Sequence, residues 1–321
     1  MSDSGLLPVM CLLGPTAAGK TDIAIDLIKR FPLEIISVDS AQVYRQMDIG
    51  TAKPDAEVLK RAPHALIDVV DPWQSYSVAR FLKDADHEIK RIHRQKKIPL
   101  LAGGTMLYFR SLWDGLSNLP ESDATVRQRW LNYLAEHGQD ALYQQLQQVD
   151  PIIADKIHSN DPQRIMRALE VHDITGETLS SLQNKRAPEQ SYDFYNLGLF
   201  PNNRALLHER IAQRFAIMLE QGFESEVESL MNLSQMNSDL PSMRSVGYRQ
   251  MCQYLANGCD KQQMTDQSLA ATRQLAKRQI TWLRGMDSCR MVDPFAESVT
   301  LVDDTLARWV ASGLENLSSA P

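Results

Sequence analysis

Cysteines and long apolar runs are both scarce in this 321-residue chain. Its apolar runs are short, such as Ile35–Val38 and Ile98–Ala102, and neither of these approaches the roughly 20 residues that cross a bilayer. The first residues carry neither the positive charge nor the apolar stretch of a signal peptide, so we expect a cytoplasmic protein without membrane contact. The four cysteines form no Cys-x-x-Cys pair, which indicates reduced thiols rather than a disulfide or metal site (Cys11, Cys252, Cys259 and Cys289).

Positive charge is also in short supply, with 34 lysines and arginines against 40 acidic residues and a net charge of −6. This balance argues against a protein that coats nucleic acid without discrimination, but it allows RNA binding through a local basic groove. The seven histidines show no metal-ligand spacing, and there is no sign of a serine or cysteine triad. Nothing in the sequence indicates a fixed oligomer, so a monomer is the default expectation.

Strands and helices alternate over the first 120 residues. Compact β-branched runs are typical of strands buried on both faces, and helical apolar stripes lie between them. This alternation predicts an α/β fold with a parallel sheet and crossover helices. The predicted strands are Leu6–Leu13, Leu33–Val38, Ala65–Val70 and Ile98–Ala102, and the predicted helices are Thr21–Arg30 and Val78–His93.

The pattern changes near Pro120, after which only helices are predicted as far as Gly176. Ser122 or Asp123 and Asp161-Pro162 are typical helix starts, and Gly138 and Gly176 are typical helix ends. A strand then returns at Tyr192–Phe200, followed by helices at Arg204–Gln221, Phe223–Leu233, Val246–Ala256 and Thr265–Arg284. We therefore predict a core formed by residues 1–120 and 196–321, with residues 121–195 as an all-helical insertion.

A glycine-rich loop lies between the first predicted strand and the first predicted helix. It matches the phosphate-binding P-loop pattern G-x-x-x-x-G-K-[ST] in full, with residues Gly14, Pro15, Thr16, Ala17, Ala18, Gly19, Lys20 and Thr21. The glycines let backbone N–H groups turn toward an anion, and the following helix directs its positive end to the same point. Lys20 adds a full charge, and the Thr21 hydroxyl is placed to bind Mg²⁺. The loop therefore predicts a di- or triphosphate site without indicating what the phosphates carry.

Two further segments leave predicted strands at the edge of the sheet where open parallel sheets bind ligands. Asp39 follows Leu33–Val38 and could be a metal carboxylate, a loop-capping residue or a general base. Gly103 and Gly104 follow Ile98–Ala102 and could form a tight turn or part of the site. Spacing alone does not choose among these roles.

Basic residues gather at three places in the helical parts of the chain: Arg164 with Arg167, Arg244 with Arg249, and Arg273, Lys277, Arg278 and Arg284 on one helix. Each cluster could be an ordinary solvated helix face. Tyr248 and Trp282 lie beside two of the clusters, and aromatic and guanidinium planes suit the unstacked bases of RNA. Solvation and RNA binding both remain open on this evidence.

Taken in order, these segments resemble the bacterial tRNA dimethylallyltransferases, the tRNA isopentenyltransferase family. The resemblance rests on the P-loop and on further matches through almost the whole chain: Ser37–Tyr44, Met47–Pro54, Ala102–Thr105, Asp161–Arg164, Val246–Gln250 and Lys277–Arg284. No departure from the family pattern is visible at these motifs. A series of this kind is far more specific than a P-loop alone.

The resemblance implies a P-loop kinase-like core with a helical insertion that grips the anticodon stem-loop of tRNA. It implies Mg²⁺-dependent transfer of a dimethylallyl group from dimethylallyl diphosphate to the exocyclic amine of the adenosine at tRNA position 37, with release of diphosphate. Asp39 matches the general base of the family, and Thr105 matches its partner near the reacting amine. The positions that match tRNA contacts are Asp39, Ser40, Ala41, Gln42, Thr105, Arg127, Gln163, Arg164, Ile165, Met166, Arg167, Arg244, Ser245, Val246, Gly247, Tyr248, Arg249, Lys277, Arg278, Gln279, Ile280, Thr281, Trp282, Leu283 and Arg284.

The implied reaction makes physical sense of these residue types. An adenine amine is a poor nucleophile, and a carboxylate at Asp39 can take its proton as the new C–N bond forms. Negative charge grows on the leaving diphosphate, where the P-loop amides, Lys20, Mg²⁺ and an arginine can stabilise it. We expect Arg214 to be that arginine. The adenosine must also leave its stack to reach the site.

Three other functions compete with this one. A small-molecule kinase would use the same P-loop for ATP, but it leaves the helical insertion and the basic C-terminal helix without a role. A prenyltransferase acting on free AMP is disfavoured by the insertion and by Arg244–Arg249, which suit a polymeric acceptor. A non-catalytic RNA-binding module is disfavoured by the intact P-loop.

Overall fold

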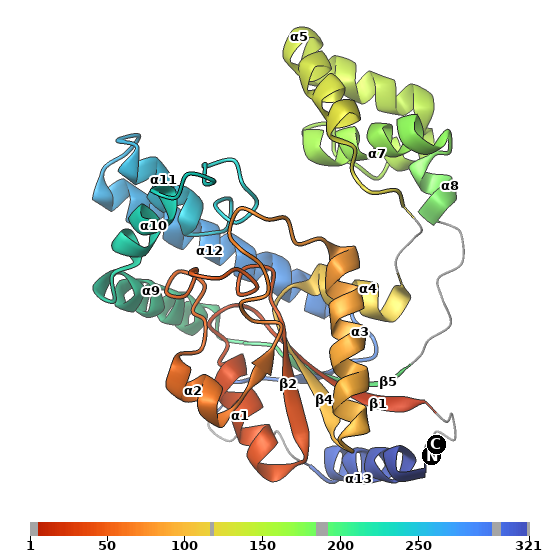
Figure 1. The fold of residues 1–321 in the computed structure, drawn as a ribbon, viewed down its shortest axis with the longest axis vertical. Helices are drawn as coiled ribbons and strands as arrows, with labels where there is room; N and C mark the ends of the chain where they lie inside the picture. The colour runs from red at the N-terminus through yellow and green to blue at the C-terminus, as the bar shows by residue number, and fades with distance from the viewer. Residues whose placement is uncertain (1–5, 116–118, 184–191, 297–302, 320–321) are drawn as a thin grey trace. The chain divides into compact units, whose positions relative to one another are not determined.

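The computed structural model describes residues 6–115, 119–183, 192–296 and 303–319, and the chain divides into two compact units (Figure 1). Unit 1 consists of Met1–Arg110 and Ser191–Pro321, and unit 2 of Ser111–Gln190. Unit 2 is therefore one continuous insertion in the chain of unit 1.

Unit 1 is built on a parallel sheet with the strand order β3-β2-β4-β1-β5-β6. The strands are β1 (Leu7–Leu13), β2 (Leu33–Val38), β3 (His64–Ala65), β4 (Ile98–Gly103), β5 (Tyr192–Leu199) and β6 (Arg290–Val292). β1 lies inside the sheet, where Met10 pairs with Leu100 of β4 on one side and Tyr195 of β5 on the other. The predicted α/β fold is confirmed.

Helices cover the sheet and extend beyond its carboxyl edge. The helices wholly within unit 1 are α1 (Lys20–Arg30), α2 (Ala56–Arg61), α3 (Val78–Arg94), α9 (Arg204–Glu220), α10 (Phe223–Met231), α11 (Tyr248–Leu255), α12 (Lys261–Arg284) and α13 (Asp304–Ser319), and α4 (Met106–Asp114) begins in unit 1 and ends in unit 2. α1 and α13 bury Leu27 and Leu306 in one cluster with strand residues such as Met10 and Leu100. α3 packs on β2 and β4 and buries Phe81, Ala85 and Ile89 at helical spacing. Within the described ranges, no helix is both long and apolar enough to cross a membrane.

The predicted strand Ala65–Val70 is wrong, because β3 ends at Ala65. Leu66 and Asp68 have positive φ angles of 63° and 55°, which take the backbone out of the extended conformation. Val70 forms an isolated parallel β-bridge with Tyr44, in the loop after β2. This compact apolar run therefore forms a bent segment bridged to the loop after β2, and not a continuous strand.

Unit 2 is all-helical, with α5 (Ala124–Val149), α6 (Pro151–Ala154), α7 (Pro162–Thr175) and α8 (Leu179–Gln183). The predicted boundaries hold: Asp123 caps α5, Asp161 caps α7, and Gly176 ends α7 with φ of 72°. Gly138 interrupts α5 at φ 80°, ψ 176°, where the sequence predicts a helix end.

The division of the chain differs from the predicted one at both ends of the insertion. Unit 2 begins at Ser111 rather than 121 and ends at Gln190 rather than 195. The second difference has a direct cause, because Tyr192–Leu199 is β5, which pairs with β1 along its length. The strand prediction at this point is confirmed, and the residues 192–195 belong to unit 1.

Candidate active site

The P-loop connects the carboxyl end of β1 to the start of α1. Gly19 has φ of 86° and is the N-cap of α1. The amides of the loop and the positive end of the helix can therefore face the same bound anion. The Lys20 amine donates to the carbonyl oxygens of Gly14 at 3.0 Å and Pro15 at 2.8 Å. These bonds hold the ammonium group over the loop. The local structure is that of an anion-binding nest.

The Lys20 side chain has a pKa below the ordinary value for a lysine. Desolvation lowers its pKa to about 8, the Asp39 carboxylate partly offsets this, and the Arg214 guanidinium adds to it. Three charged side chains from separate elements are thus within electrostatic reach of one another. The structure therefore brings Lys20, Asp39 and Arg214 into one site, as the sequence predicts.

Two arginines from α9 contact the P-loop. Arg214 donates a hydrogen bond to the Thr16 hydroxyl, and burial lowers its pKa while Asp39 opposes that shift. Arg210, one turn earlier on α9, donates to the Ala17 carbonyl at 3.1 Å. The sequence predicts Arg214 at this site but not Arg210. The signal that could have found Arg210 is its i, i+4 spacing from Arg214, which puts both on one helix face.

Asp39 begins the loop after β2. Its Oδ1 accepts hydrogen bonds from the Ala41 amide at 2.8 Å and the Gln42 amide at 3.3 Å, which form an Asx-turn. In the described part of the chain, its other oxygen receives no hydrogen bond. Thr105 lies beside this turn, where its hydroxyl oxygen accepts from the Ser40 amide at 3.0 Å.

Gly103 and Gly104 each allow a neighbouring group to approach the backbone closely: Val38 at Gly103, and the Gln279 side chain at Gly104. A Cβ on Gly103 would lie 2.0 Å from the Val38 carbonyl oxygen, so the ends of β2 and β4 can meet only with glycine here. A Cβ on Gly104 would lie 2.4 Å from the Gln279 amide nitrogen. The two glycines therefore bring Asp39, Thr105 and α12 together.

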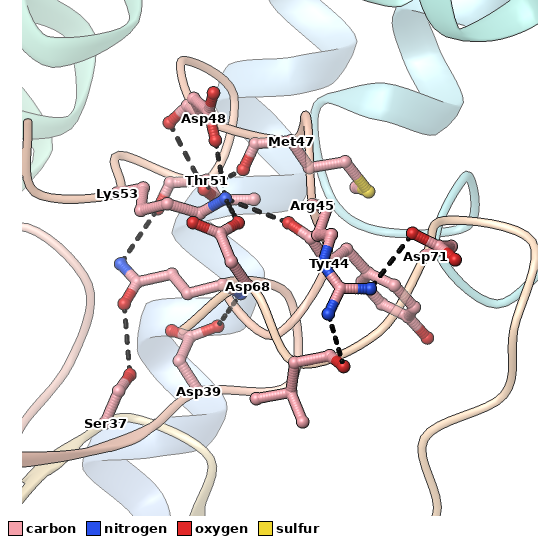
Figure 2. Close-up of polar contacts among 12 residues, drawn as sticks. Ser37, Asp39, Tyr44, Arg45, Met47, Asp48, Thr51, Lys53, Asp68 and Asp71 are labelled. Carbon is pink, nitrogen blue, oxygen red and sulfur yellow. Dashed lines mark hydrogen bonds and ion pairs between the residues drawn. The ribbon is translucent and has the colours of Figure 1, made fainter. Parts of the chain in front are cut away.

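The loop between Asp39 and Pro54 is held by a polar network (Figure 2). The Gln42 side chain accepts from the Ser37 hydroxyl at 3.1 Å and donates to the Thr51 and Ala52 carbonyls at 3.3 Å each. Lys53 has a side chain only 4% exposed, and Figure 2 shows its amine between the carboxylates of Asp48 and Asp68. The distances are 2.5 Å and 2.6 Å, with a third bond of 2.9 Å to the Tyr44 carbonyl. No role for Lys53 is predicted from the sequence.

A cavity of about 490 Å³ joins these groups, a size suited to a small-molecule ligand. Charged and polar side chains line it together with the apolar side chains of Ile217 and Leu275. The polar lining includes Thr16, Lys20, Thr21, Asp39, Gln42 and Arg214. The cavity can therefore accept an anion together with an apolar group.

The residues present also fit Mg²⁺. Among the described residues, no three His, Cys, Asp or Glu side chains converge as a metal site. Mg²⁺ bound to a phosphate ligand needs only one or two oxygen donors from the protein, however. The Thr21 hydroxyl and the Asp39 carboxylate line the same cavity and provide oxygens of that kind.

Comparison with protein families gives two matches to this chain. The model of the IPP transferase family matches residues 42–286, and that of the isopentenyl transferases matches residues 7–69. The chain belongs to the IPP transferase family.

Individual relatives of this IPP transferase extend the comparison. It is 50% identical over 300 residues to the tRNA dimethylallyltransferase of Legionella pneumophila strain Corby, covering 94% of this chain and 95% of the relative. A crystal structure of the full-length tRNA isopentenylpyrophosphate transferase from Bacillus halodurans aligns with a TM-score of 0.67 and 34% identity, over 97% of this chain and 98% of that one. A eukaryotic dimethylallyltransferase captured acting on tRNA aligns with a TM-score of 0.79 and 27% identity, over 98% and 80% of the two chains.

The residues expected to contact tRNA in this IPP transferase fall into three groups by exposure. Six are buried: Ile165, Gly247, Tyr248, Gln279, Ile280 and Leu283. The exposed group consists of Ser40, Arg127, Gln163, Arg164, Arg244, Arg249, Lys277, Arg278, Thr281, Trp282 and Arg284. Asp39, Ala41, Gln42, Thr105, Met166, Arg167, Ser245 and Val246 are half-buried.

Tyr248 and Trp282 differ sharply as stacking platforms for RNA bases. The Trp282 side chain is 41% exposed, and the Arg110 guanidinium lies 5.5 Å from its ring centroid. Tyr248 is fully buried and packs edge-on against Phe223 at 5.1 Å between ring centroids. The suggestion that the Tyr248 ring stacks on a base is therefore wrong, because the ring belongs to the packing of α10 and α11.

Gln279 also points inward, contrary to its expected place among the RNA contacts. Its side-chain oxygen accepts from the Thr16 amide at 2.9 Å, and its nitrogen donates to the Gly104 carbonyl at 2.8 Å. Both ends of the amide are thus used to join the P-loop to the turn before Thr105. This is a structural link between the phosphate site and the Asp39 side of the cavity.

In unit 2, Arg164 and Arg167 are not equivalent. The Arg164 side chain is 73% exposed and has Asp161 as a neighbour at 3.3 Å. Arg167 donates to the Pro120 carbonyl at 2.6 Å and pairs with the buried Glu170 at 3.2 Å. Glu170 in turn accepts from the Ser122 hydroxyl and the Asp123 amide at the start of α5. The Arg167 guanidinium, which the resemblance places among the tRNA contacts, is therefore engaged inside unit 2.

Proposed function

We propose that this chain transfers a dimethylallyl group from dimethylallyl diphosphate to the exocyclic amine of the adenosine at tRNA position 37, releasing diphosphate. The observation that carries the proposal is the single cavity in which Lys20 and Arg214 of the phosphate nest face Asp39. The family membership and the names of the relatives supply the nature of the two substrates.

The phosphate nest would bind the donor. The P-loop amides, the Lys20 ammonium and the Arg214 guanidinium would stabilise the negative charge that develops as the C–O bond to diphosphate breaks. Thr21 would hold Mg²⁺ against the diphosphate, and the ion would neutralise part of that charge. The apolar wall of Ile217 and Leu275 lies in the same cavity, where it can cover the hydrocarbon part of the donor.

Asp39 would act on the acceptor. As the C–N bond forms, the amine loses a proton, and the Asp39 oxygen that receives no hydrogen bond would accept it. Thr105, fixed beside the Asx-turn by Ser40, would hold the adenine amine in line with the donor. The adenosine must be flipped out of its stack to reach these groups.

The acceptor's tRNA body would be bound by exposed basic residues of both units. Arg164 and Arg127 of unit 2, and Arg244, Arg249 and Lys277 of unit 1, all present side chains to solvent. We propose that unit 2 binds the anticodon stem-loop. We further propose that the enzyme works as a monomer in the cytoplasm, where its acceptor is found.

The test uses radiolabelled dimethylallyl diphosphate with purified protein and Mg²⁺, offered in turn to unmodified tRNA, tRNA lacking A37, and AMP. Label should enter only the first. In parallel, γ-labelled ATP is offered with the same acceptors and should label none of them. Label in AMP, or phosphoryl transfer from ATP, would contradict the proposal.

A further inference from the structure

The α10 residue Glu226 binds the backbone of a loop far away in the sequence. Its Oε2 accepts from the amides of Asp48 at 2.9 Å and Ile49 at 2.6 Å, and its Oε1 accepts from the amide of Gly50 at 3.1 Å. Three consecutive N–H groups thus converge on one carboxylate. Hydrogen bonds to a charged acceptor are stronger than those between neutral groups, so this contact is a firm one.

The same carboxylate also fixes the start of α11. The Tyr248 hydroxyl donates to Glu226 Oε1 at 2.6 Å, and burial together with the Glu226 charge raises the pKa of Tyr248. Tyr248 is the first residue of α11, and the exposed Arg249 is the second. Glu226 therefore joins the Asp48–Gly50 turn to the helix that carries a candidate RNA-binding arginine.

The packing at this junction leaves no room for a shift. A Cβ on Gly50 would lie 2.1 Å from the Phe223 ring and 2.6 Å from the Tyr248 ring. The turn is thus pressed against both aromatic rings while Glu226 holds its amides. Closely packed contacts of this kind transmit displacement instead of absorbing it.

From the turn, hydrogen bonds lead directly to Asp39. Thr51 and Ala52 follow Gly50, and both of their carbonyls accept from the Gln42 side chain. The backbone N–H of the same residue, Gln42, is one of the two N–H groups that orient the Asp39 carboxylate. Glu226 is therefore linked to Asp39 through the turn and Gln42.

Charge alone does not explain an acidic residue here. Glu226 is bonded to the first residue of α11, whose second residue is the exposed Arg249, and a negative charge near a bound polyanion opposes RNA binding. If its charge were its only effect, removing it would strengthen RNA binding and leave the transfer rate unchanged. Its four accepted hydrogen bonds point to a geometric role.

We propose that Glu226 is a positioning residue, which holds the Asp39 loop in its working geometry and couples it to the start of α11. The proposal rests on the proposed function, because it concerns the placement of Asp39 against the acceptor amine. The phosphate nest has its own supports, Gln279, Arg210 and Arg214, and does not depend on Glu226.

The experiment compares Glu226→Ala, Glu226→Gln and Tyr248→Phe with the control Glu224→Gln. Glu224 lies in the same first turn of α10 but pairs with exposed Lys261 at 3.2 Å. Single-turnover transfer is measured at saturating tRNA and dimethylallyl diphosphate. Calorimetric titration with inorganic diphosphate and Mg²⁺ gives the affinity of the nest and counts the competent sites.

Glu226→Ala should lower the transfer rate per competent site about 10- to 100-fold, since small misplacements of catalytic groups have effects of that size. Its diphosphate affinity should stay within about twofold of wild type. Glu226→Gln and Tyr248→Phe should lower the transfer rate less than Glu226→Ala, because each keeps part of the hydrogen bonds to residue 226. Glu224→Gln should have the wild-type transfer rate.

A wild-type rate per competent site in Glu226→Ala would overturn the proposal, even if fewer sites were competent, because that is the pattern of a purely structural residue. An equal loss in Glu224→Gln would also overturn it. If Glu226→Ala does not fold, a wild-type rate in Glu226→Gln serves as the contrary result. Absence of transfer by the wild-type protein would instead contradict the proposed function.

Discussion

At the scale of single residues, the charge state of Lys20 controls the phosphate nest. Its pKa is lowered to about 8 by desolvation, so the ammonium is lost at a lower pH than in an ordinary lysine. Below pH 8 the group is charged and attracts diphosphate; above pH 8 the unliganded protein loses that charge.

We therefore predict that the affinity for diphosphate falls as pH rises above 8, by up to about tenfold per pH unit. Lys20→Met should bind diphosphate more weakly and lack this dependence. Calorimetric titrations from pH 7 to 9.5 measure the ratio of the two affinities, which cancels the ionisation of diphosphate itself. A ratio that does not change with pH would contradict the prediction. Retention of tRNA on filters should be nearly unchanged in Lys20→Met.

Asp39 is the residue on which the proposed mechanism depends most. Asp39→Asn keeps the size of the side chain and its Asx-turn oxygen but removes the proton acceptor. The single-turnover rate should fall by a factor of about 10² to 10⁴ while both substrates still bind. The measurement is repeated over a range of Mg²⁺ concentrations. Recovery of the wild-type rate at high Mg²⁺ would mean that Asp39 serves as a metal ligand instead of a base.

Lys53 stabilises the loop that carries these groups. Lys53→Met should lower the free energy of unfolding by about 1–3 kcal/mol, because the Tyr44 carbonyl and two carboxylates lose their buried partner. The loss is limited because Asp48 and Asp68 are themselves 61% and 45% exposed and can be hydrated. Urea unfolding measures it, with the exposed Lys60→Met as the control. Equal stability of the two variants would show that the Lys53 cluster contributes nothing.

At the scale of elements, α7 presents two arginines with separate tasks. Arg164→Ala should weaken tRNA binding and reduce the slope of log affinity against log salt by about 0.7 to 0.9, with thermal stability unchanged. Arg167→Ala should mainly lower the melting temperature, because it leaves the buried Glu170 without its partner. Salt-dependent binding and thermal melts of both variants test the distinction. An exchange of the two results would reverse the assignment.

The elements also show what the sequence could and could not predict. The P-loop was predictable because its residues are contiguous and its geometry is local. Gln279 was predictable in principle, since Ala276, Gln279, Ile280 and Leu283 form the buried i, i+3, i+4, i+7 stripe of α12. The inward place of Tyr248 was not, because it depends on Phe223 and Glu226 of another helix. The end of β3 depends on two positive φ angles that no residue type there demands.

At the scale of the whole molecule, unit 2 has an apolar core of its own. It contains Leu142, Leu146 and Ile165, and among the described residues its members differ from those of the two clusters of unit 1 around Met10 and Ile211. Separate cores favour separate unfolding transitions.

We predict two transitions in differential scanning calorimetry, of which diphosphate and Mg²⁺ raise only one. At 100 times the dissociation constant the stabilisation should be about 2.7 kcal/mol, or roughly 5–10 °C for a unit of this size. Leu146→Ala, which opens a cavity in the core of unit 2, should lower only the other transition. A single transition that responds to both changes would contradict the independence of the units.

The place of unit 2 in the chain has a consequence for synthesis on the ribosome. β1 and β4 both leave the ribosome before unit 2, but β5, the other neighbour of β1, comes after it. At about 5–20 residues per second, the roughly 80 residues of unit 2 delay β5 by about 4 to 16 s. During that time unit 2 can complete its own core, whereas one edge of β1 still lacks its partner and can pair with another nascent chain. The insertion that we expect to bind tRNA thus also imposes a waiting time during which the catalytic sheet depends on protection from its surroundings.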